Sequence, residues 1–145
     1  MSRKGKGTTI LLLTDGNDLP LAAHIAGANQ NEVNLIEPLL DRSVLDQRYW
    51  PATRLLYDKA ADSDPLREQL GERFVELICP HRGNRKKPPT QDGRKLRRYR
   101  HRWRIERSIS WLQRFKRLVV RYEYHADLFL GLIQLACLYT ILQRF

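Results

Sequence analysis

The chain has 145 residues, of which 42% are hydrophobic, and this matches the size and composition of one globular domain with its own core. Its formal charge of +10 is unevenly spread. Residues 1–76 carry nine Lys or Arg against twelve Asp or Glu (−3), whereas residues 77–145 carry seventeen against four (+13). Such clustered cations, interleaved with aromatic residues, argue against an evenly solvated basic surface and indicate binding to a polyanion such as nucleic acid.

The cysteines and the most apolar segment bear on the cellular setting. Cys79 and Cys137 stand in apolar stretches and match no metal motif, so we expect buried, reduced thiols of a cytosolic protein. The segment Leu128–Leu142 is short for a membrane span and contains polar and small residues, which predicts a buried core helix. The N-terminus is basic but lacks the apolar run of a signal peptide.

The N-terminal third predicts a β-hairpin and a helix. Thr8–Thr14 is rich in β-formers, and Leu19–Ala26 resumes this pattern after the turn cluster Asp15–Asp18. Segment 29–42 then has apolar residues at helical spacing, with Asn31 as the N-cap.

The middle of the chain predicts two short strands around a helix. Arg54–Asp58 is interpreted as a strand ending in an acid, and Phe74–Cys79 as a second strand. Between them, Asp64 as N-cap and Pro65 at the first helical position predict a helix. Pro80–Gly93 is a basic loop rich in Pro and Gly that we expect to be mobile.

Two further helices are predicted, from about Lys95 to Leu118 and from Ala126 to Arg144. Short strands that alternate with helices after an initial hairpin predict an α/β sheet with a mixed hairpin edge.

Glu106 is an isolated acid in the most basic part of the chain. At 100° per residue it shares a polar helix stripe with Tyr99, Arg102, Ser110, Gln113 and Arg117, while apolar residues occupy the rest of the helix. A helix docked by its apolar face would aim this carboxylate rigidly. The spacing leaves two interpretations open: a salt bridge to Arg102 one turn earlier, or a metal ligand.

Asp58 is the predicted partner of Glu106. It ends a strand, and open α/β sheets collect their ligands outside the carboxyl ends of strands. Two carboxylates suit Mg²⁺ or Mn²⁺, which would activate a nucleophile and stabilise the leaving oxygen of a phosphodiester. Asp62 is a rival to Asp58. The histidines show no ligand spacing and are interpreted as surface or packing residues: His24, His81, His101 and His125.

Three segments carry a resemblance to a known family. Tyr99, Arg102 and Glu106, in the run "WRIERSISWLQRFKRLVVRYE" and the residues before it, have the spacing of the C-terminal motif of DDE-type bacterial insertion-sequence transposases, in the group of insertion sequences four and five. That motif ends in Lys, where this chain has Gln113 with Arg114 beside it. "LYDKAADSDPLRE" resembles the family segment around the second catalytic Asp, which would be Asp58, and "GANQNEVNLIEPLLD" resembles a segment before the first helix.

The resemblance covers nearly the whole chain and implies an RNase H-like fold with Mg²⁺-dependent DNA strand cleavage and transfer. The first catalytic Asp should lie on the fold's first strand, upstream of the predicted hairpin, whereas Asp15 and Asp18 sit in a turn. Residues 1–145 are therefore expected to be the C-terminal part of a catalytic domain that lacks its first strand. An upstream segment would complete it, and it would act on nucleoid DNA in a bacterial cytoplasm, alone or as a homo-oligomer.

The cations of this region are expected to hold DNA phosphates. The expected DNA contacts are Tyr99, Arg102, Arg114, Arg117, Lys86 and Lys87, with Arg85 as a further loop cation. Trp103 and Trp111 are interpreted as packing residues rather than base-stacking platforms. Two other functions remain open: a non-catalytic DNA-binding remnant, favoured by Ala60 and Ala61 where the family usually has Gly and an aromatic residue, and a metal-dependent nuclease.

Overall fold

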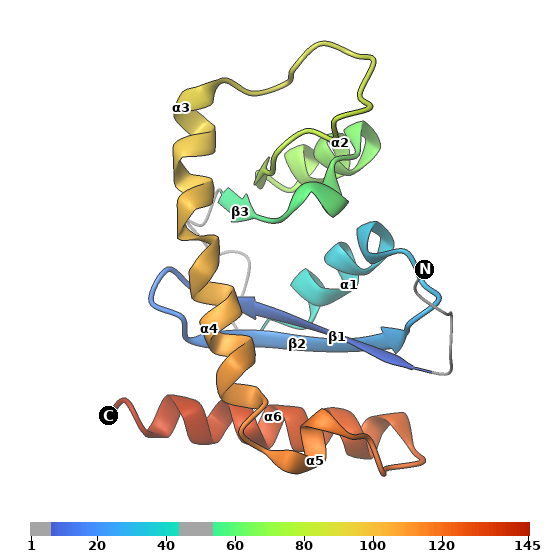
Figure 1. Ribbon diagram of the computed structural model, residues 1–145, viewed down its shortest axis with the longest axis vertical. Helices are drawn as coiled ribbons and strands as arrows, with labels where there is room; N and C mark the ends of the chain where they lie inside the picture. Colours follow the sequence, from blue (N-terminus) through green and yellow to red (C-terminus); the bar gives the residue numbers. More distant parts are fainter. Residues whose placement is uncertain (1–6, 44–53) are drawn as a thin grey trace. The chain divides into compact units, whose positions relative to one another are not determined.

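A computed structural model describes residues 7–43 and 54–145 (Figure 1). These residues form a mixed α/β structure with two small sheets and flanking helices, as the sequence predicts at this level. The chain divides into two compact units. The first comprises Met1–Leu45 and Arg104–Phe145, and the second comprises Asp46–Trp103.

The first unit is built around an antiparallel hairpin. Strand β1 (Thr8–Thr14) pairs with β2 (Pro20–Gly27), and each lies within one residue of its predicted position. Leu11 and Leu13 are buried on one face of the hairpin. Ala23 pairs with Leu12 across the two strands, so its side chain lies on the other face, where it belongs to the core. Both faces therefore need a helical cover.

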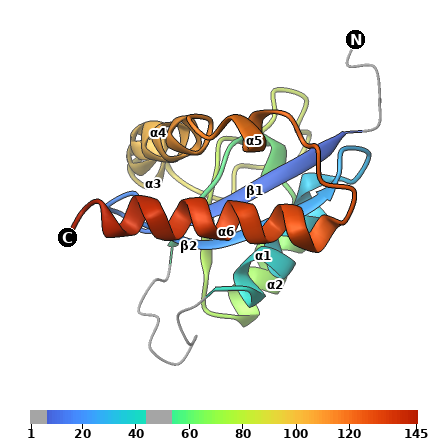
Figure 2. The same ribbon diagram turned by 90° about the horizontal axis from the view of Figure 1, so that it is seen from below.

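Two helices supply that cover, and the hairpin lies between them (Figures 1 and 2). Helix α1 (Ile36–Asp41) follows the 3-10 helix η1 (Glu32–Leu35) and packs on one face. Asn31 is the predicted cap, since its side chain accepts a hydrogen bond from the Val33 N–H, but the first turn is 3-10 rather than α. Helix α6 (Ala126–Leu142) covers the other face through Phe129 and related residues.

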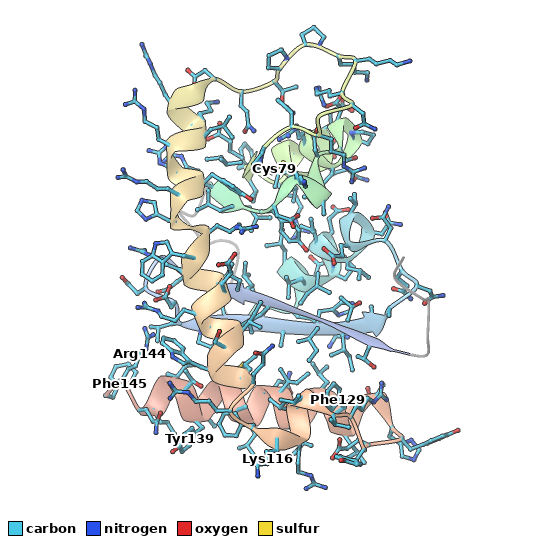
Figure 3. All side chains as sticks on the ribbon, in the orientation of Figure 1. Cys79, Lys116, Phe129, Tyr139, Arg144 and Phe145 are labelled. Carbon is cyan, nitrogen blue, oxygen red and sulfur yellow. The ribbon has the colours of Figure 1, made fainter. Side chains whose placement is uncertain are left out.

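Helix α6 is buried on one face only. Phe129 and Ile133 are at most 1% exposed, yet the opposite face carries large apolar side chains that are more than half exposed: Leu128, Leu135, Leu138, Tyr139 and Leu142. The prediction of a buried helix is thus correct for one face only (Figure 3 labels Phe129 and Tyr139). Within the described residues, α6 and the other helices are too short or too polar to cross a membrane.

The second unit is a β-α-β arrangement. Strand β3 (Arg54–Leu56) pairs in parallel with β4 (Glu76–Ile78), and helix α2 (Asp64–Glu72) connects them after the 3-10 helix η3 (Lys59–Ala61). Both strands are shorter than predicted. Strand β3 ends early because the chain turns into η3 after Tyr57, whose N–H still donates to the Ile78 carbonyl.

The N-cap of α2 differs from the prediction by one residue. Ser63 Oγ accepts from the Leu66 N–H at 3.5 Å, so Ser63 is the cap and Asp64 is the first helical residue. Leu66 and Leu70 then fall on the buried side of the helix, at 2% and 0% exposure. The carboxylate of Asp64 is thereby left for ion pairs.

The predicted helix from Lys95 to Leu118 is wrong in two places. It consists of α3 (Gly93–Leu96), the 3-10 helix η4 (Arg97–Arg102) and α4 (Trp103–Leu112), and it ends six residues early. A separate short helix, α5 (Lys116–Val119), follows a turn. The helix stops because Leu112 and Leu118 both enter the core under α6, which one straight helix would not allow.

Candidate functional site

Asp58 lies directly past the carboxyl end of the parallel pair β3–β4. Its backbone is extended, and its Oδ1 accepts a hydrogen bond from the Ala60 N–H at 2.7 Å, so Asp58 is the N-cap of η3. This bond uses one of about four acceptor positions of a carboxylate. The carboxylate is therefore fixed in position while keeping the capacity to bind a hard cation.

Glu106 stands on the solvent side of α4. Ser108 and Leu112 mark the buried side of this helix, and Glu106 is exposed. The Ser110 hydroxyl donates to the Glu106 backbone carbonyl at 2.9 Å. As predicted from the helix pattern, α4 packs through its buried side and presents Glu106 to solvent on the opposite side.

Tyr99 and Arg102 do not continue the stripe of Glu106 on one regular α-helix. Both lie in η4, where three residues complete a turn, so positions i and i+3 stack directly above each other. The Arg102 guanidinium accordingly lies 5.4 Å from the centre of the Tyr99 ring. The structure brings these two residues together as a cation–π pair.

The two candidate metal ligands belong to different units. Asp58 is in the second unit and Glu106 in the first, so their pairing stays a prediction. No cluster of three or more His, Cys, Asp or Glu side chains suited to a metal ion occurs within residues 7–43 and 54–145. The donor types at the two predicted positions, both carboxylates, fit a hard divalent cation.

Asp62, the rival to Asp58, is occupied by the protein itself. Its side chain is 2% exposed and accepts from the Arg82 N–H at 2.8 Å, from Arg67 Nη2 at 2.9 Å and from Arg85 Nη1 at 3.4 Å. His81 Nδ1 also lies 2.9 Å from Asp62 Oδ1. These donors give Asp62 a structural role as the centre of an ion-pair network.

The electrostatics of Asp62 agree with that role. Burial favours the neutral acid, but the hydrogen bonds from the Arg82 N–H, His81 and Arg67 outweigh it and lower the pKa of Asp62 to about 2. His81 is thus a hydrogen-bond partner of Asp62 rather than a simple surface or packing residue. Sequence spacing could not reveal this network, because His81 and Arg82 lie about twenty positions from Asp62.

The basic loop after β4, which the sequence predicts to be mobile, is attached to the unit at several points. Arg82 Nη2 donates to the Ala60 carbonyl at 2.6 Å, and the Thr90 N–H donates to His81 Nε2 at 3.2 Å. Arg85 bridges Asp62 and Asp64, and its side chain is 12% exposed. Arg85 therefore has a structural role through these ion pairs, and its phosphate contact stays a prediction.

Lys86 and Lys87 are the exposed cations at the tip of this loop. The Lys87 ammonium lies 3.1 Å from Asp64 Oδ2, although its side chain is 74% exposed. The ion pairs with Arg85 and Lys87 lower the pKa of Asp64 below its usual value, Arg85 having the larger effect. Lys86 and Lys87 are thus differently placed, which the sequence "RKK" does not reveal.

Asp15 and Asp18 have structural work in the β1–β2 turn. Asp15 Oδ1 accepts from the N–H groups of Asn17 and Leu19 at 2.7 and 2.8 Å. Asp18 has a positive φ of 66°, is 1% exposed and forms an ion pair with Arg107. Ser108 Oγ also donates to the Asp18 carbonyl at 3.3 Å. The turn therefore anchors α4 and fixes the rotation that turns Glu106 outward.

Trp111 lies between two guanidinium groups. Arg107 and Arg144 have their Cζ atoms 5.2 and 4.5 Å from its ring centre, and Arg144 also donates to the Asn17 carbonyl (Figure 3 labels Arg144). Trp111 is half-buried in this arrangement. Its interpretation as a packing residue fits these contacts, whereas Trp103 is 47% exposed.

Arg114 and Arg117 are exposed around the break between α4 and α5. Arg117 is 73% exposed and lies 3.4 Å from a Glu123 oxygen. Both guanidinium groups can reach a ligand from solvent.

The two cysteines are buried free thiols, as predicted, and burial raises the pKa of Cys137 to about 11.

Comparison with known proteins gives one family and one curated relative. The family model described as the transposase DDE domain matches residues 2–141. A protein assigned as a transposase for insertion sequence element IS402 of Burkholderia cepacia is 34% identical over 140 residues, covering 93% of this chain. The chain spans 63% of that relative's length. No solved structure matches the chain.

Proposed function

The chain belongs to the DDE-type transposase family, and from this premise we propose that it is part of a transposase that cuts and joins DNA strands. The observation that carries the proposal is the extent of the family match. It runs over residues 2–141 and so includes Asp58 and Glu106 together with the motif residues around them.

We assign these residues to the C-terminal part of an RNase H-like catalytic domain. An antiparallel hairpin and a separate parallel pair are compatible with such a mixed sheet, which would be completed by a first strand carrying the first catalytic Asp. The match covers 63% of the relative's length, so the relative is longer than this chain. The missing strand and Asp would come from a segment preceding the hairpin.

Asp58 and Glu106 would hold a divalent cation, Mg²⁺ or Mn²⁺, in this proposal. The bound cation would activate the attacking oxygen and stabilise the leaving oxygen of the phosphodiester. Asp58 contributes a carboxylate restrained by the Ala60 N–H, and Glu106 contributes one from a helix anchored through Ser108. Restraint of both side chains would hold the ligands in place during the reaction.

The DNA backbone would be held by the exposed cations. Lys86, Lys87, Arg114 and Arg117 are accessible to phosphate, and the Tyr99–Arg102 pair offers a guanidinium backed by a ring. The partners would be the element's DNA ends and target, an upstream transposase segment and further copies of the protein, at the nucleoid of a bacterial cell.

Two related functions remain as outcomes of the experiment. A DNA-binding remnant without activity is favoured by Ala60 and Ala61, which replace larger or more flexible residues beside Asp58. A nuclease would use the same carboxylates without strand joining.

The test compares cleavage and joining of end-containing DNA by a protein of the relative's full length. Asp58→Asn and Glu106→Gln are each expected to abolish Mg²⁺-dependent cleavage and to preserve DNA binding. Asp127→Asn, which removes an exposed acid at the start of α6, is the matched control and should remain active. Normal cleavage by Glu106→Gln would return Glu106 to a salt-bridge role. Cleavage without joining would indicate a nuclease, and no cleavage by the unmodified protein would indicate a remnant.

A further inference from the structure

The segment that joins α5 to α6 (Figure 2) contains two largely exposed tyrosines. Tyr122 is 75% exposed and Tyr124 is 91% exposed. We propose that segment 120–125 is a single-stranded DNA site, in which Tyr122 and Tyr124 stack on unpaired bases. This inference rests on the DNA binding proposed above and specifies the form of DNA that this surface takes.

The segment has the side-chain alternation of an extended chain. Val120, Tyr122 and Tyr124 are exposed, whereas the two residues between them, Arg121 and Glu123, turn inward. Val120 has extended dihedral angles, φ −120° and ψ 118°. Positions two apart on an extended segment are separated by about 6.6 Å, which is twice the roughly 3.4 Å rise per nucleotide in a strand. Such spacing can accommodate one base between the two rings.

Arg121 holds this segment in shape. Its Nε donates to the Glu123 carbonyl at 2.9 Å, its Nη2 to the Tyr124 carbonyl at 3.0 Å and its Nη1 to Thr8 Oγ1 at 2.8 Å. Its Cζ atom also lies 5.3 Å from the centre of the Phe129 ring in the core. The planar guanidinium thus fastens the segment to β1 and to itself.

This fastening explains why the exposed rings favour a ligand. Exposed tyrosines on a loose loop would lose conformational entropy on binding, whereas rings on a fastened segment have already lost most of it. Each of the three guanidinium nitrogens of Arg121 donates a hydrogen bond within the protein, so we assign Arg121 the role of positioning the tyrosines rather than of contacting phosphate. A positioned ring with an accessible face is the main element of a stacking platform.

The charge of the surroundings selects nucleic acid as the ligand. Residues 114–125 contain Arg114, Lys116, Arg117 and Arg121 against Glu123, which gives a net charge of +3. Three of these cations are exposed, and Lys116 is labelled at the start of α5 in Figure 3. Cations together with exposed rings match single-stranded DNA, because duplex DNA keeps its base faces covered.

The experiment titrates a protein of the relative's full length against a labelled single strand of about 12 nucleotides, and against the duplex of the same sequence, by fluorescence anisotropy. Tyr122→Ala and Tyr124→Ala should each weaken single-strand binding about tenfold, a stacking loss of about 1.4 kcal/mol, with little change for the duplex. The slope of affinity against salt should stay unchanged, since no charge is removed. Tyr122→Phe and Tyr124→Phe keep the ring and should bind normally.

Phe145→Ala is the matched control for removing an exposed ring, because Phe145 is 96% exposed and belongs to the same unit. It should bind both DNA forms normally. Arg121→Lys keeps the charge but loses the planar fork, so it should weaken single-strand binding selectively without altering the salt slope. Arg121→Gln removes the charge, and a slope reduced by about one in this variant would show a phosphate contact and overturn the positioning role.

Unchanged single-strand affinity in both Ala variants, or an equal loss for single strand and duplex, would overturn the stacking site and leave the proposed DNA binding intact. Tight duplex binding by the unmodified chain without single-strand binding would have the same meaning. Binding to neither form would remove DNA as the ligand and would count against the proposed function itself.

Discussion

Asp58 and Asp62 lie four residues apart and have opposite surroundings. Asp58 accepts one backbone hydrogen bond at 2.7 Å, whereas Asp62 is enclosed by Arg67, His81, Arg82 and Arg85. A carboxylate surrounded by donors at 2% exposure is suited to holding a fold together. The one with acceptor capacity remaining is suited to a ligand.

Asp62→Asn should therefore lower the free energy of unfolding, and it should not specifically impair metal binding. The folded-state pKa of about 2 lies below the usual 3.8, so Asp62 contributes stability above pH 4 that is lost as pH falls toward 2. The contribution is about 2 kcal/mol near neutral pH. Urea unfolding followed by circular dichroism should show this loss at pH 7 and a much smaller difference near pH 2.

Glu72→Gln, an exposed change on α2, serves as the control for Asp62→Asn and should leave the urea midpoint nearly unchanged. An equal midpoint for Asp62→Asn and the unmodified chain at pH 7 would contradict the assigned role of the network.

At the scale of elements, the basic loop combines anchoring and exposed cations. Arg82 and Arg85 are used to attach the loop to η3 and α2, while Lys86 and Lys87 extend into solvent. A loop anchored by its arginines presents its lysines in a restricted region. The cations that bind DNA can therefore be separated experimentally from those that fold the loop.

The slope of log affinity against log salt concentration for duplex binding should be near −5 if about six phosphates are contacted. Lys86→Ala should reduce the magnitude of this slope by about one. Lys87→Ala should lower it by clearly less, because Asp64 already neutralises part of the Lys87 charge at 3.1 Å. Asp64→Asn in a protein that keeps Lys87 should release the Lys87 ammonium and make the slope steeper. These slopes come from titrations at a series of salt concentrations, and equal effects of the two lysines would contradict the difference in their surroundings.

At the scale of the whole molecule, both sheets are two-stranded and so have open edges. Within the described residues, β1 pairs with β2 alone and β3 with β4 alone. Open strand edges invite association with other chains, and α6 adds an apolar outer face that includes Leu135 and Leu142. The chain by itself therefore exposes surface that a longer protein would be expected to cover.

Residues 1–145 alone are expected to be poorly soluble and inactive, and a preceding segment with the first strand should improve both properties. The reason is physical, because that strand would pair with an open edge and supply a third carboxylate. Soluble yield and Mg²⁺-dependent cleavage, measured with and without the preceding coding segment, provide the test. Full activity from residues 1–145 alone would refute the expectation.

The sequence by itself determined the local elements and the family. The β-rich apolar runs and the Asp-Gly-Asn-Asp turn located β1 and β2 to within one residue. The start signal around Asp64 and Pro65 located α2, and the apolar C-terminal run located α6. Asn31 was identifiable as a cap because capping involves neighbours two residues away. The linked motifs around Asp58 and Glu106 indicated a DDE-type transposase, and the family match confirms it.

Only the tertiary structure decided which charged residues serve the fold. Arg85 and Lys86 are adjacent cations, yet Arg85 is partly buried and paired with Asp62 and Asp64 while Lys86 is exposed. The same holds for Arg121, which is fastened to Thr8 across 113 positions of sequence. Helical periodicity also predicted that α4 continues past Leu112. Periodicity carries no information about tertiary packing, and it is the packing of Leu112 and Leu118 in the core under α6 that requires a turn there. Such partners are distant in sequence, so only the folded chain brings their charges together and determines which remain for DNA.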